Sequence, residues 1–203
     1  MDASGGRLRD VAGAVILGGG STRMGRDKAC VTIDGVAAAT RIARILCALF
    51  EDVMLVGGDP PANAPGRSVP DSAGPPCPLR GIVAALSATG AERVLVVATD
   101  LPLVTPALLL GMVAWPRAEV VVPRPCGVAQ PLCALYQRDV AQRAALARFQ
   151  AGQLAAQGLL STLQASYLED PDLAELDPEG TALANLNTPE DLAWAEAIVA
   201  RTR

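Results

Sequence analysis

Residues 11–28 read VAGAVILGGGSTRMGRDK, an apolar run that passes directly into a glycine-rich loop. The run from Val11 to Leu17 has no polar side chain, which predicts a buried strand with helices covering both of its faces. The glycines that follow allow backbone N–H groups to approach a phosphate, and the loop ends in the cation Lys28. The stretch therefore predicts an α/β protein with a phosphate site directly after its first strand.

This loop differs from the two common phosphate-binding loops. A Walker loop has Lys and then Ser or Thr after its second glycine, whereas Arg26 and Asp27 follow Gly25 here. A dinucleotide-binding fingerprint has a third glycine where this sequence has Arg23, which argues against a dehydrogenase. The alternative to a phosphate site of another kind is an ordinary glycine turn.

Beyond the loop, short apolar runs alternate with longer stretches of helical periodicity. The expected strands span residues 53–56, 93–98, 119–122 and 132–136, with a further short strand near 68–70. The expected helices span residues 37–50, 79–89 and 106–113, and residues 138–164 are predicted to be mostly helical, with an interruption around Gly152 and Gly158. This alternation predicts a Rossmann-like three-layer αβα sandwich with a mostly parallel central sheet, formed by residues 1–203 as a single domain.

The composition restricts the chemistry that the chain can perform. Lys and Arg number 17 against 21 Asp and Glu, so the 203-residue chain has a net charge of -4 and lacks the basic field of a nucleic-acid binder. Histidine is absent, which excludes Ser-His-Asp and Cys-His mechanisms and every His-ligated zinc site. Carboxylate, amine, thiol and metal–oxygen chemistry remain.

Cysteine spacing and hydropathy indicate where the chain is found. The five cysteines are widely spaced without a CxxC pair, as expected of free thiols in a reducing compartment. The longest weakly charged stretch, residues 94–116, is broken by Asp100 and by three prolines, so a membrane-spanning helix is not expected. We expect a cytoplasmic protein without a membrane or nucleic-acid partner.

Two aspartates follow expected strands. Asp100 comes directly after the strand at 93–98, and ligands of open α/β sheets bind at the carboxyl ends of the strands. A single carboxylate there is a suitable ligand for Mg²⁺ that is also bound to nucleotide phosphates, and a turn or capping aspartate is the alternative. Asp71 lies in a proline-rich loop, where it could contact a base, a ribose or the metal, or simply be exposed.

The C-terminal stretch LNTPED, residues 186–191, has the pattern of a helix start. Thr188 is a suitable N-cap, Pro189 a suitable first helical residue, and the first turn is acidic. Asn185 and Asn187 are two residues apart and would point the same way from an extended segment. Capping explains most of this pattern, and contact of the asparagines with a ligand is the further possibility.

Together these motifs resemble a known family. LGGGSTRMGRDK at 17–28 is similar to the signature LAGGxSxRMGxDK of molybdenum cofactor guanylyltransferases, with Gly18 in place of alanine. The other landmarks follow in the family's order: Asp71, CPLRGI at 77–82, ATDLP at 98–102, QPLCALY at 130–136 and NLNTPEDL at 185–192. The chain departs from the family pattern at Cys77, at Gln130 and in residues 152–160, which carry glutamines where the family is more basic.

The resemblance implies a nucleotidyltransferase that transfers GMP from Mg²⁺-GTP to the terminal phosphate of molybdopterin and releases pyrophosphate. It implies that Mg²⁺ is held by Asp100, and that the catalytic groups are Arg23, Lys28 and Asp100. The implied nucleotide-binding residues are Leu17, Gly18, Gly19, Gly20, Ser21, Lys28, Asp71, Gly81 and Asp100. Asn185 and Asn187 would lie near the acceptor, and transient contact with molybdoenzyme-maturation proteins is a further expectation.

Two alternatives remain. One is a related cytidylyltransferase, or another transferase of this fold that acts on a different phosphorylated acceptor; the pair Asp27 and Lys28 favours the guanylyl type. The other is a non-catalytic nucleotide-binding accessory protein, which would be expected to lack Lys28 or Asp100. Both residues are present.

Overall fold

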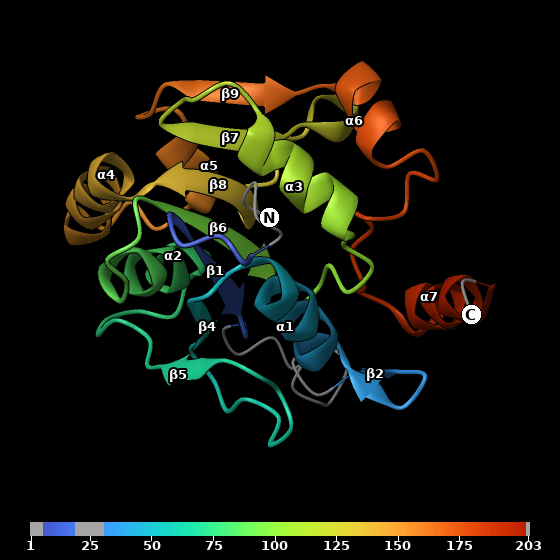
Figure 1. The fold of residues 1–203 in the computed structure, drawn as a ribbon. Coiled ribbons are helices and arrows are strands. Elements are labelled where there is room, and N and C mark those ends of the chain that lie inside the picture. The colour runs from blue at the N-terminus through green and yellow to red at the C-terminus, as the bar shows by residue number, and fades with distance from the viewer. Residues whose placement is uncertain (1–5, 19–30, 202–203) are drawn as a thin grey trace.

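A seven-stranded sheet lies between two layers of helices in the computed structural model, which describes residues 6–18 and 31–201 (Figure 1). The strand order is β5-β4-β1-β6-β8-β7-β9. Neighbouring strands run parallel except at β8, which is antiparallel to both β6 and β7. The predicted αβα sandwich with a mostly parallel sheet is confirmed, and β8 is the exception to the parallel arrangement.

The elements have the following bounds. The strands of the sheet and of a small separate hairpin are β1 (Val11–Ile16), β2 (Thr32–Ile33), β3 (Val36–Ala37), β4 (Val53–Val56), β5 (Arg67–Val69), β6 (Arg93–Ala98), β7 (Val120–Pro123), β8 (Cys133–Gln137) and β9 (Ala165–Leu168). The helices are α1 (Ala38–Leu49), α2 (Pro78–Ser87), α3 (Pro106–Ala114), the 3₁₀ helix η2 (Pro125–Gly127), α4 (Arg138–Gln150), α5 (Ala156–Leu160), α6 (Asp170–Leu176) and α7 (Pro189–Arg201). Over residues 6–18 and 31–201, none of these helices is both long and apolar enough to cross a membrane.

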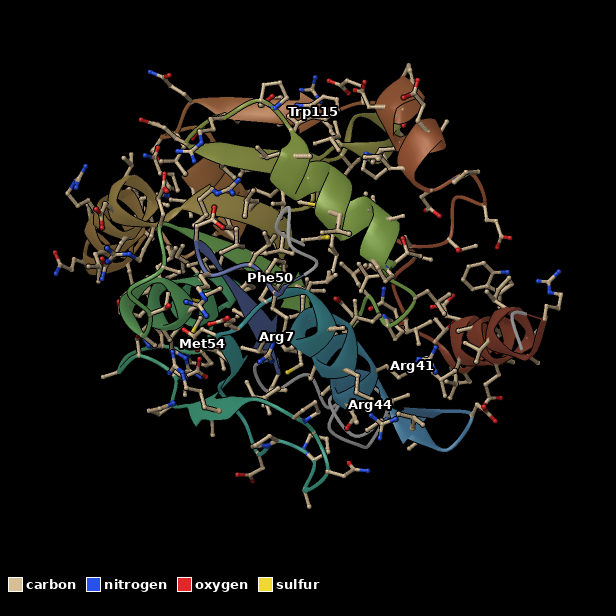
Figure 2. All side chains as sticks on the ribbon, in the orientation of Figure 1. Arg7, Arg41, Arg44, Phe50, Met54 and Trp115 are labelled. Carbon is tan, nitrogen blue, oxygen red and sulfur yellow. The ribbon has the colours of Figure 1, made fainter. Side chains whose placement is uncertain are left out.

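Side chains on the two faces of the sheet form two separate cores. Val11 and Val15 of β1 belong to the core under α1, α3 and α6, whereas Ala12, Ala14 and Ile16 belong to the core under α2, α4 and α5. Phe50, at the end of α1, and Met54, on the neighbouring strand β4, lie in opposite cores (Figure 2). The alternation confirms that helices cover both faces of β1.

Most element boundaries predicted from the local sequence agree with the structure. Strands β4 and β6 occupy the predicted residues 53–56 and 93–98, and α1, α2 and α3 begin and end within two residues of the predicted helices. The Thr105 hydroxyl accepts a hydrogen bond from the Leu108 backbone N–H at 3.2 Å, with Pro106 as the first residue of α3. This is the predicted N-cap, and it satisfies one of the free donors at the helix start.

Two parts of the fold differ from the sequence predictions. Residues 138–164 contain α4 and α5, and the predicted interruption near Gly152 is confirmed as the loop between them; Gly158, however, lies inside α5, and the helical region ends at Leu160 rather than at residue 164. The strand β9 and the β2–β3 hairpin were not predicted, because they are only four and two residues per strand and have no long apolar run. Pairing with β7, rather than local propensity, makes residues 165–168 a strand.

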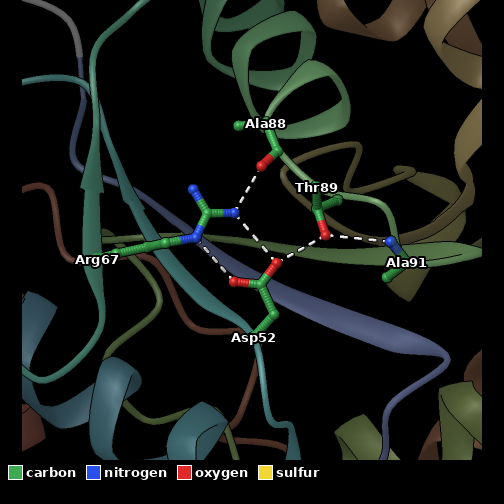
Figure 3. Close-up of polar contacts among 5 residues, drawn as sticks. All are labelled: Asp52, Arg67, Ala88, Thr89 and Ala91. Carbon is green, nitrogen blue, oxygen red and sulfur yellow. Dashed lines mark hydrogen bonds and ion pairs between the residues drawn. The ribbon is translucent and has the colours of Figure 1, made fainter.

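An exposed polar network joins β4, β5 and α2 at the amino ends of the strands (Figure 3). Arg67 donates from Nε to Asp52 Oδ1 at 2.9 Å and from Nη2 to Asp52 Oδ2 at 3.1 Å. Arg67 Nη2 also donates to the Ala88 carbonyl at 2.6 Å, and the Thr89 hydroxyl donates to Asp52 Oδ2 at 2.7 Å. The network fastens the edge strand β5 to the end of α2.

Candidate active site

A cavity of about 270 Å³ opens at the carboxyl ends of β1 and β6, where ligands of α/β sheets bind. Its floor is the end of β1, and its walls come from the loop before α2, from α2 itself and from the residues after β6. The lining residues are Ile16, Gly18, Asp71, Pro76, Cys77, Pro78, Arg80, Gly81, Ala98, Thr99, Asp100 and Leu132. Asp71, Gly18, Gly81 and Asp100, which are far apart in the sequence, are thereby brought together.

A second cavity of about 280 Å³ lies beside the first. It is lined by Pro78, Asp100, Leu101, Gln130, Pro131, Leu132, Ala155, Ala156, Gln157 and Asn185. Pro78, Asp100 and Leu132 line both cavities, so Asp100 lies at their junction. Two molecules that occupy the two cavities would meet beside Asp100.

The position of Asp100 follows from the end of β6. The strand ends at Ala98, and a tight turn is closed by the hydrogen bond from the Leu101 N–H to the Ala98 carbonyl at 3.2 Å. The Asp100 carbonyl accepts from the Leu186 N–H at 2.8 Å, which brings the C-terminal segment to this edge of the sheet. The turn therefore places a carboxylate and the segment with Asn185 at the same site.

The donor set suits a metal ion that is bound mainly by its nucleotide. Within the part of the chain that the structure describes, no group of three or more His, Cys, Asp or Glu side chains could hold a metal by itself. Mg²⁺ on nucleotide phosphates commonly takes only one or two protein carboxylates. Asp100 is a carboxylate of this kind, at the cavity junction.

Two glycines allow the cavity walls to come close. A Cβ on Gly81 would lie 2.9 Å from Ile16 Cγ2, so the absence of a side chain lets the first turns of α2 approach the end of β1. Gly18 has φ +96°, a left-handed conformation that favours glycine, directly after the buried Leu17. Five further residues of the predicted site lie outside the described residues: Gly19, Gly20, Ser21, Arg23 and Lys28.

The two asparagines of the C-terminal motif have different environments. Asn185 lines the second cavity. Asn187 is not among the residues that line it; its backbone N–H donates to Asp191 Oδ2 at 2.9 Å, and the Thr188 hydroxyl accepts from the Asp191 N–H at 3.1 Å. Backbone hydrogen bonds, first of all from Asn187, hold the pKa of Asp191 below its ordinary value. The capping interpretation is confirmed for Thr188.

The lining residues that were not predicted as site residues include one arginine and two glutamines. Arg80 lines the first cavity, and Gln130 and Gln157 line the second. Gln157 is oriented by a hydrogen bond from its Nε2 to the Ala129 carbonyl at 2.6 Å. The sequence could have indicated all three residues. Arg80 and Gln130 lie in the family-like motifs at 77–82 and 130–136, and Gln157 lies in residues 152–160, which depart from the family pattern.

Two side chains of β8, Cys133 and Tyr136, have raised pKa values because they are buried. Burial raises the pKa of the Cys133 thiol from its ordinary value of 9.0 to about 12, and the negative charge of Asp100 contributes in the same direction. Burial also raises the pKa of the Tyr136 hydroxyl, which donates to the Pro131 carbonyl at 2.7 Å. Both groups stay protonated in the folded protein at neutral pH.

This shift predicts a loss of stability at alkaline pH. Above pH 9 the unfolded chain loses the Cys133 proton and the folded chain keeps it, so the free energy of unfolding falls as pH rises towards 12. Between pH 8 and pH 10 we expect this residue to account for roughly 1 kcal/mol of lost stability. Urea unfolding at both pH values checks this. A Cys133→Ala variant should lose less stability over the interval, and an equal loss in both proteins would contradict the assignment.

The fold is the α/β fold of nucleotidyltransferases. The solved structure of molybdopterin-guanine dinucleotide biosynthesis protein A from Archaeoglobus fulgidus is similar, with a TM-score of 0.80, 23% identity and coverage of 94% of this chain and 99% of that chain. The 2-C-methyl-D-erythritol 4-phosphate cytidylyltransferase from Thermus thermophilus shares the fold with a TM-score of 0.70, 18% identity and coverage of 92% and 98%. At these identities the likeness concerns the fold alone.

Sequence comparison identifies the family. The MobA-like NTP transferase domain matches residues 13–169. Probable molybdenum cofactor guanylyltransferases from Pelotomaculum thermopropionicum and Mycolicibacterium paratuberculosis are 31% and 37% identical, over 97% and 92% of this chain and 97% and 96% of those proteins. The chain belongs to the MobA-like NTP transferase family, which confirms the resemblance found in its motifs.

Proposed function

We propose that this chain, acting as one catalytic domain in the cytoplasm, transfers GMP from Mg²⁺-GTP to the terminal phosphate of molybdopterin in molybdenum cofactor biosynthesis. The observation that carries the proposal is the position of Asp100 at the junction of two cavities. Relatives along nearly the whole chain are named molybdenum cofactor guanylyltransferases, which supports the choice of nucleotide and acceptor.

The first cavity would hold the nucleotide. Gly18 and Gly81 line its end near β1, and Asp71 lies on its wall. Leu17 is buried directly before Gly18 and is not among the lining residues, so its part in nucleotide binding stays a prediction from the motif. In the sequence after Gly18, Arg23 and Lys28 would bind the triphosphate, Gly19 would contact the base and the nucleotide backbone with Leu17 and Gly18, and Gly20 and Ser21 would also contact the nucleotide. The phosphate-loop pattern of residues 17–28 supports these assignments. Asp100 would hold Mg²⁺, which when bound would neutralise negative charge on the phosphates.

The second cavity would hold the acceptor. The side-chain amides of Gln130, Gln157 and Asn185 give it hydrogen-bonding groups without a net charge. Such groups suit the ring of a pterin, which has both donors and acceptors. The acceptor phosphate would then point towards Asp100 and the α-phosphate of the nucleotide, and Asn187 would assist from the adjoining segment.

The reaction needs no protein base. An oxygen of the anionic acceptor phosphate attacks the α-phosphorus of GTP, the new O–P bond forms, and the bond to the β-phosphate oxygen breaks to release pyrophosphate. The protein has to align the two reactants and to stabilise negative charge in the transition state, which is the role proposed for Arg23 and Lys28. A chain without histidine can therefore perform this reaction.

The direct test is a pyrophosphate-release assay with purified protein, Mg²⁺ and molybdopterin, comparing GTP, CTP and ATP. The proposal expects turnover with GTP that requires both molybdopterin and the metal ion. Turnover with CTP instead would make the chain a cytidylyltransferase. Binding of GTP without pyrophosphate release would contradict the acceptor assignment, and would direct attention to another phosphorylated acceptor or to an accessory role, including contact with molybdoenzyme-maturation proteins.

Lys28→Ala is expected to lower the rate of this reaction by about 10²-fold to 10³-fold, because it removes one group that stabilises charge in the transition state. Steady-state rates of pyrophosphate release at saturating GTP check the prediction. Lys28→Arg, which keeps the charge, should recover part of the loss. Wild-type turnover in Lys28→Ala would remove this residue from the mechanism.

A further inference from the structure

Arg80 and Asp71 form an ion pair on the wall of the first cavity, which is proposed to hold the nucleotide. Arg80, in the first turn of α2, donates from Nη2 to Asp71 Oδ2 at 2.6 Å and from Nη1 to the Gly74 carbonyl at 3.2 Å. Both side chains line the cavity and are only about one-fifth exposed, at 20% for Arg80 and 21% for Asp71. The family-like motif CPLRGI contains this arginine, but its resemblance assigns no role to it.

The surroundings hold this pair in one arrangement. The Asp71 carboxylate lies against Gly57, where a Cβ would be 2.7 Å from Oδ2 and where φ is +74°. On the other side, Gly74 packs against Phe149, whose Cζ would lie 2.7 Å from a Cβ at that position. Glycine at both positions lets the loop close around the pair, so the Asp71 carboxylate is oriented before any ligand binds.

The position of the pair matches the base end of a nucleotide. Gly57 follows β4, Asp100 follows β6, and β1 lies between these strands. Two strand spacings correspond to about 10 Å along the sheet edge. A nucleotide whose phosphates are bound near Asp100 and the end of β1 would therefore extend its base towards Asp71.

The hydrogen-bonding capacity of the pair suits guanine. Arg80 occupies one site on Oδ2, and among the described residues no hydrogen bond reaches Asp71 Oδ1, so the carboxylate can accept further N–H groups. Guanine has two adjacent donors, N1–H and the 2-amino group, whereas adenine and cytosine have a single donor group beside an acceptor. A fixed carboxylate accepts both guanine donors, and it faces an acceptor lone pair in the other two bases.

We propose that Arg80 is a specificity-determining residue, which positions the Asp71 carboxylate to read the two N–H donors of guanine. This inference rests on the proposed function and deepens it, because it names the residues that select the base. Arg80 acts through Asp71 and takes no part in the reaction at phosphorus.

The test is nucleotide binding by full-length protein in the absence of acceptor, measured by calorimetry with GTP, ITP, CTP and ATP. ITP lacks only the 2-amino group of GTP, so the ratio of the two affinities reports the contact with that group. The wild type should prefer GTP to ITP by roughly 10-fold or more. In Arg80→Met, GTP binding should weaken roughly 10-fold and the GTP to ITP ratio should fall towards one, with partial recovery in Arg80→Lys.

The chain provides a matched control. Arg67 also forms an ion pair with an aspartate, Asp52, but at the amino ends of β4 and β5, whereas Asp71 follows the carboxyl end of β5. Like Arg80, Arg67 also donates to a backbone carbonyl, that of Ala88 at the end of α2 (Figure 3). Arg67→Met should leave the GTP to ITP ratio unchanged, and thermal unfolding of each variant reports whether it folds. If Arg80→Met folds and keeps the wild-type ratio, the inference is overturned and Arg80 only fastens the loop.

The test also separates this inference from the proposed function. Wild-type protein that binds CTP or ATP as tightly as GTP would overturn the guanylyl assignment itself. Preference for GTP that persists in Arg80→Met would leave that assignment standing and overturn only the role of Arg80. A GTP to ITP ratio that falls in Arg80→Met, but not in Arg67→Met, supports both.

Discussion

Asp100→Asn is expected to lower the rate of pyrophosphate release by more than about 10³-fold. Losing one charge-stabilising group costs about 10²-fold to 10³-fold, and this carboxylate is placed where it would hold the metal between both substrates. Asparagine has the same shape, but it lacks the negative charge that binds the metal. The main-chain hydrogen bond between Leu186 and residue 100 does not depend on the side chain, so the fold should persist.

Steady-state assays over a range of Mg²⁺ concentrations, together with thermal unfolding, check this result. Asp139→Asn is the control, because that exposed aspartate lies in the first turn of α4, beyond the opposite edge of the sheet. The control should have wild-type turnover. If Asp100→Asn turns over as fast as the control, Asp100 does not hold the metal and the proposed arrangement of the two substrates is wrong.

Phe50→Ala is expected to reduce the free energy of unfolding by about 3–5 kcal/mol, which corresponds to a fall in Tm of about 10 °C in a chain of this size. Phe50 is fully buried and follows α1, and its ring packs on β1 at Gly13, where a Cβ would lie 3.1 Å from Cδ2 (Figure 2). Since Gly13 has no side chain to move into the space, alanine would leave a cavity between α1 and the sheet.

Urea unfolding and thermal unfolding of purified protein measure this loss. Phe50→Leu fills more of the space and should lose less stability than Phe50→Ala. Nucleotide binding below the unfolding transition should be retained in both variants, because Phe50 is not among the residues that line the two cavities. A stability equal to that of the wild type in Phe50→Ala would show that this contact between α1 and β1 is not an important part of the core.

The sequence by itself determined those elements whose signals are local. The apolar runs at 53–56 and 93–98 predicted β4 and β6. A strand that is buried on both faces is a continuous apolar run, so its own sequence is enough to predict it. The caps of α3 and α7 followed from Thr105 and Thr188, since a capping hydroxyl bonds to the N–H three residues along the same helix. The motif at 17–28, together with those at 77–82, 98–102, 130–136 and 185–192, also indicates the family from the sequence alone.

Only the tertiary structure decided the features that depend on distant partners. Residues 165–168 became β9 by pairing with β7, and β8 runs antiparallel to both of its neighbours, which no local pattern indicates. The tertiary structure placed Asn185 beside the second cavity and left Asn187 in the capping arrangement. It also placed Arg80 against Asp71, and Asp100 at the junction of two cavities. Such contacts arise because the sheet brings the ends of strands that are not consecutive in the sequence to one edge. The order of the strands in the sequence does not determine which strand ends will be neighbours there.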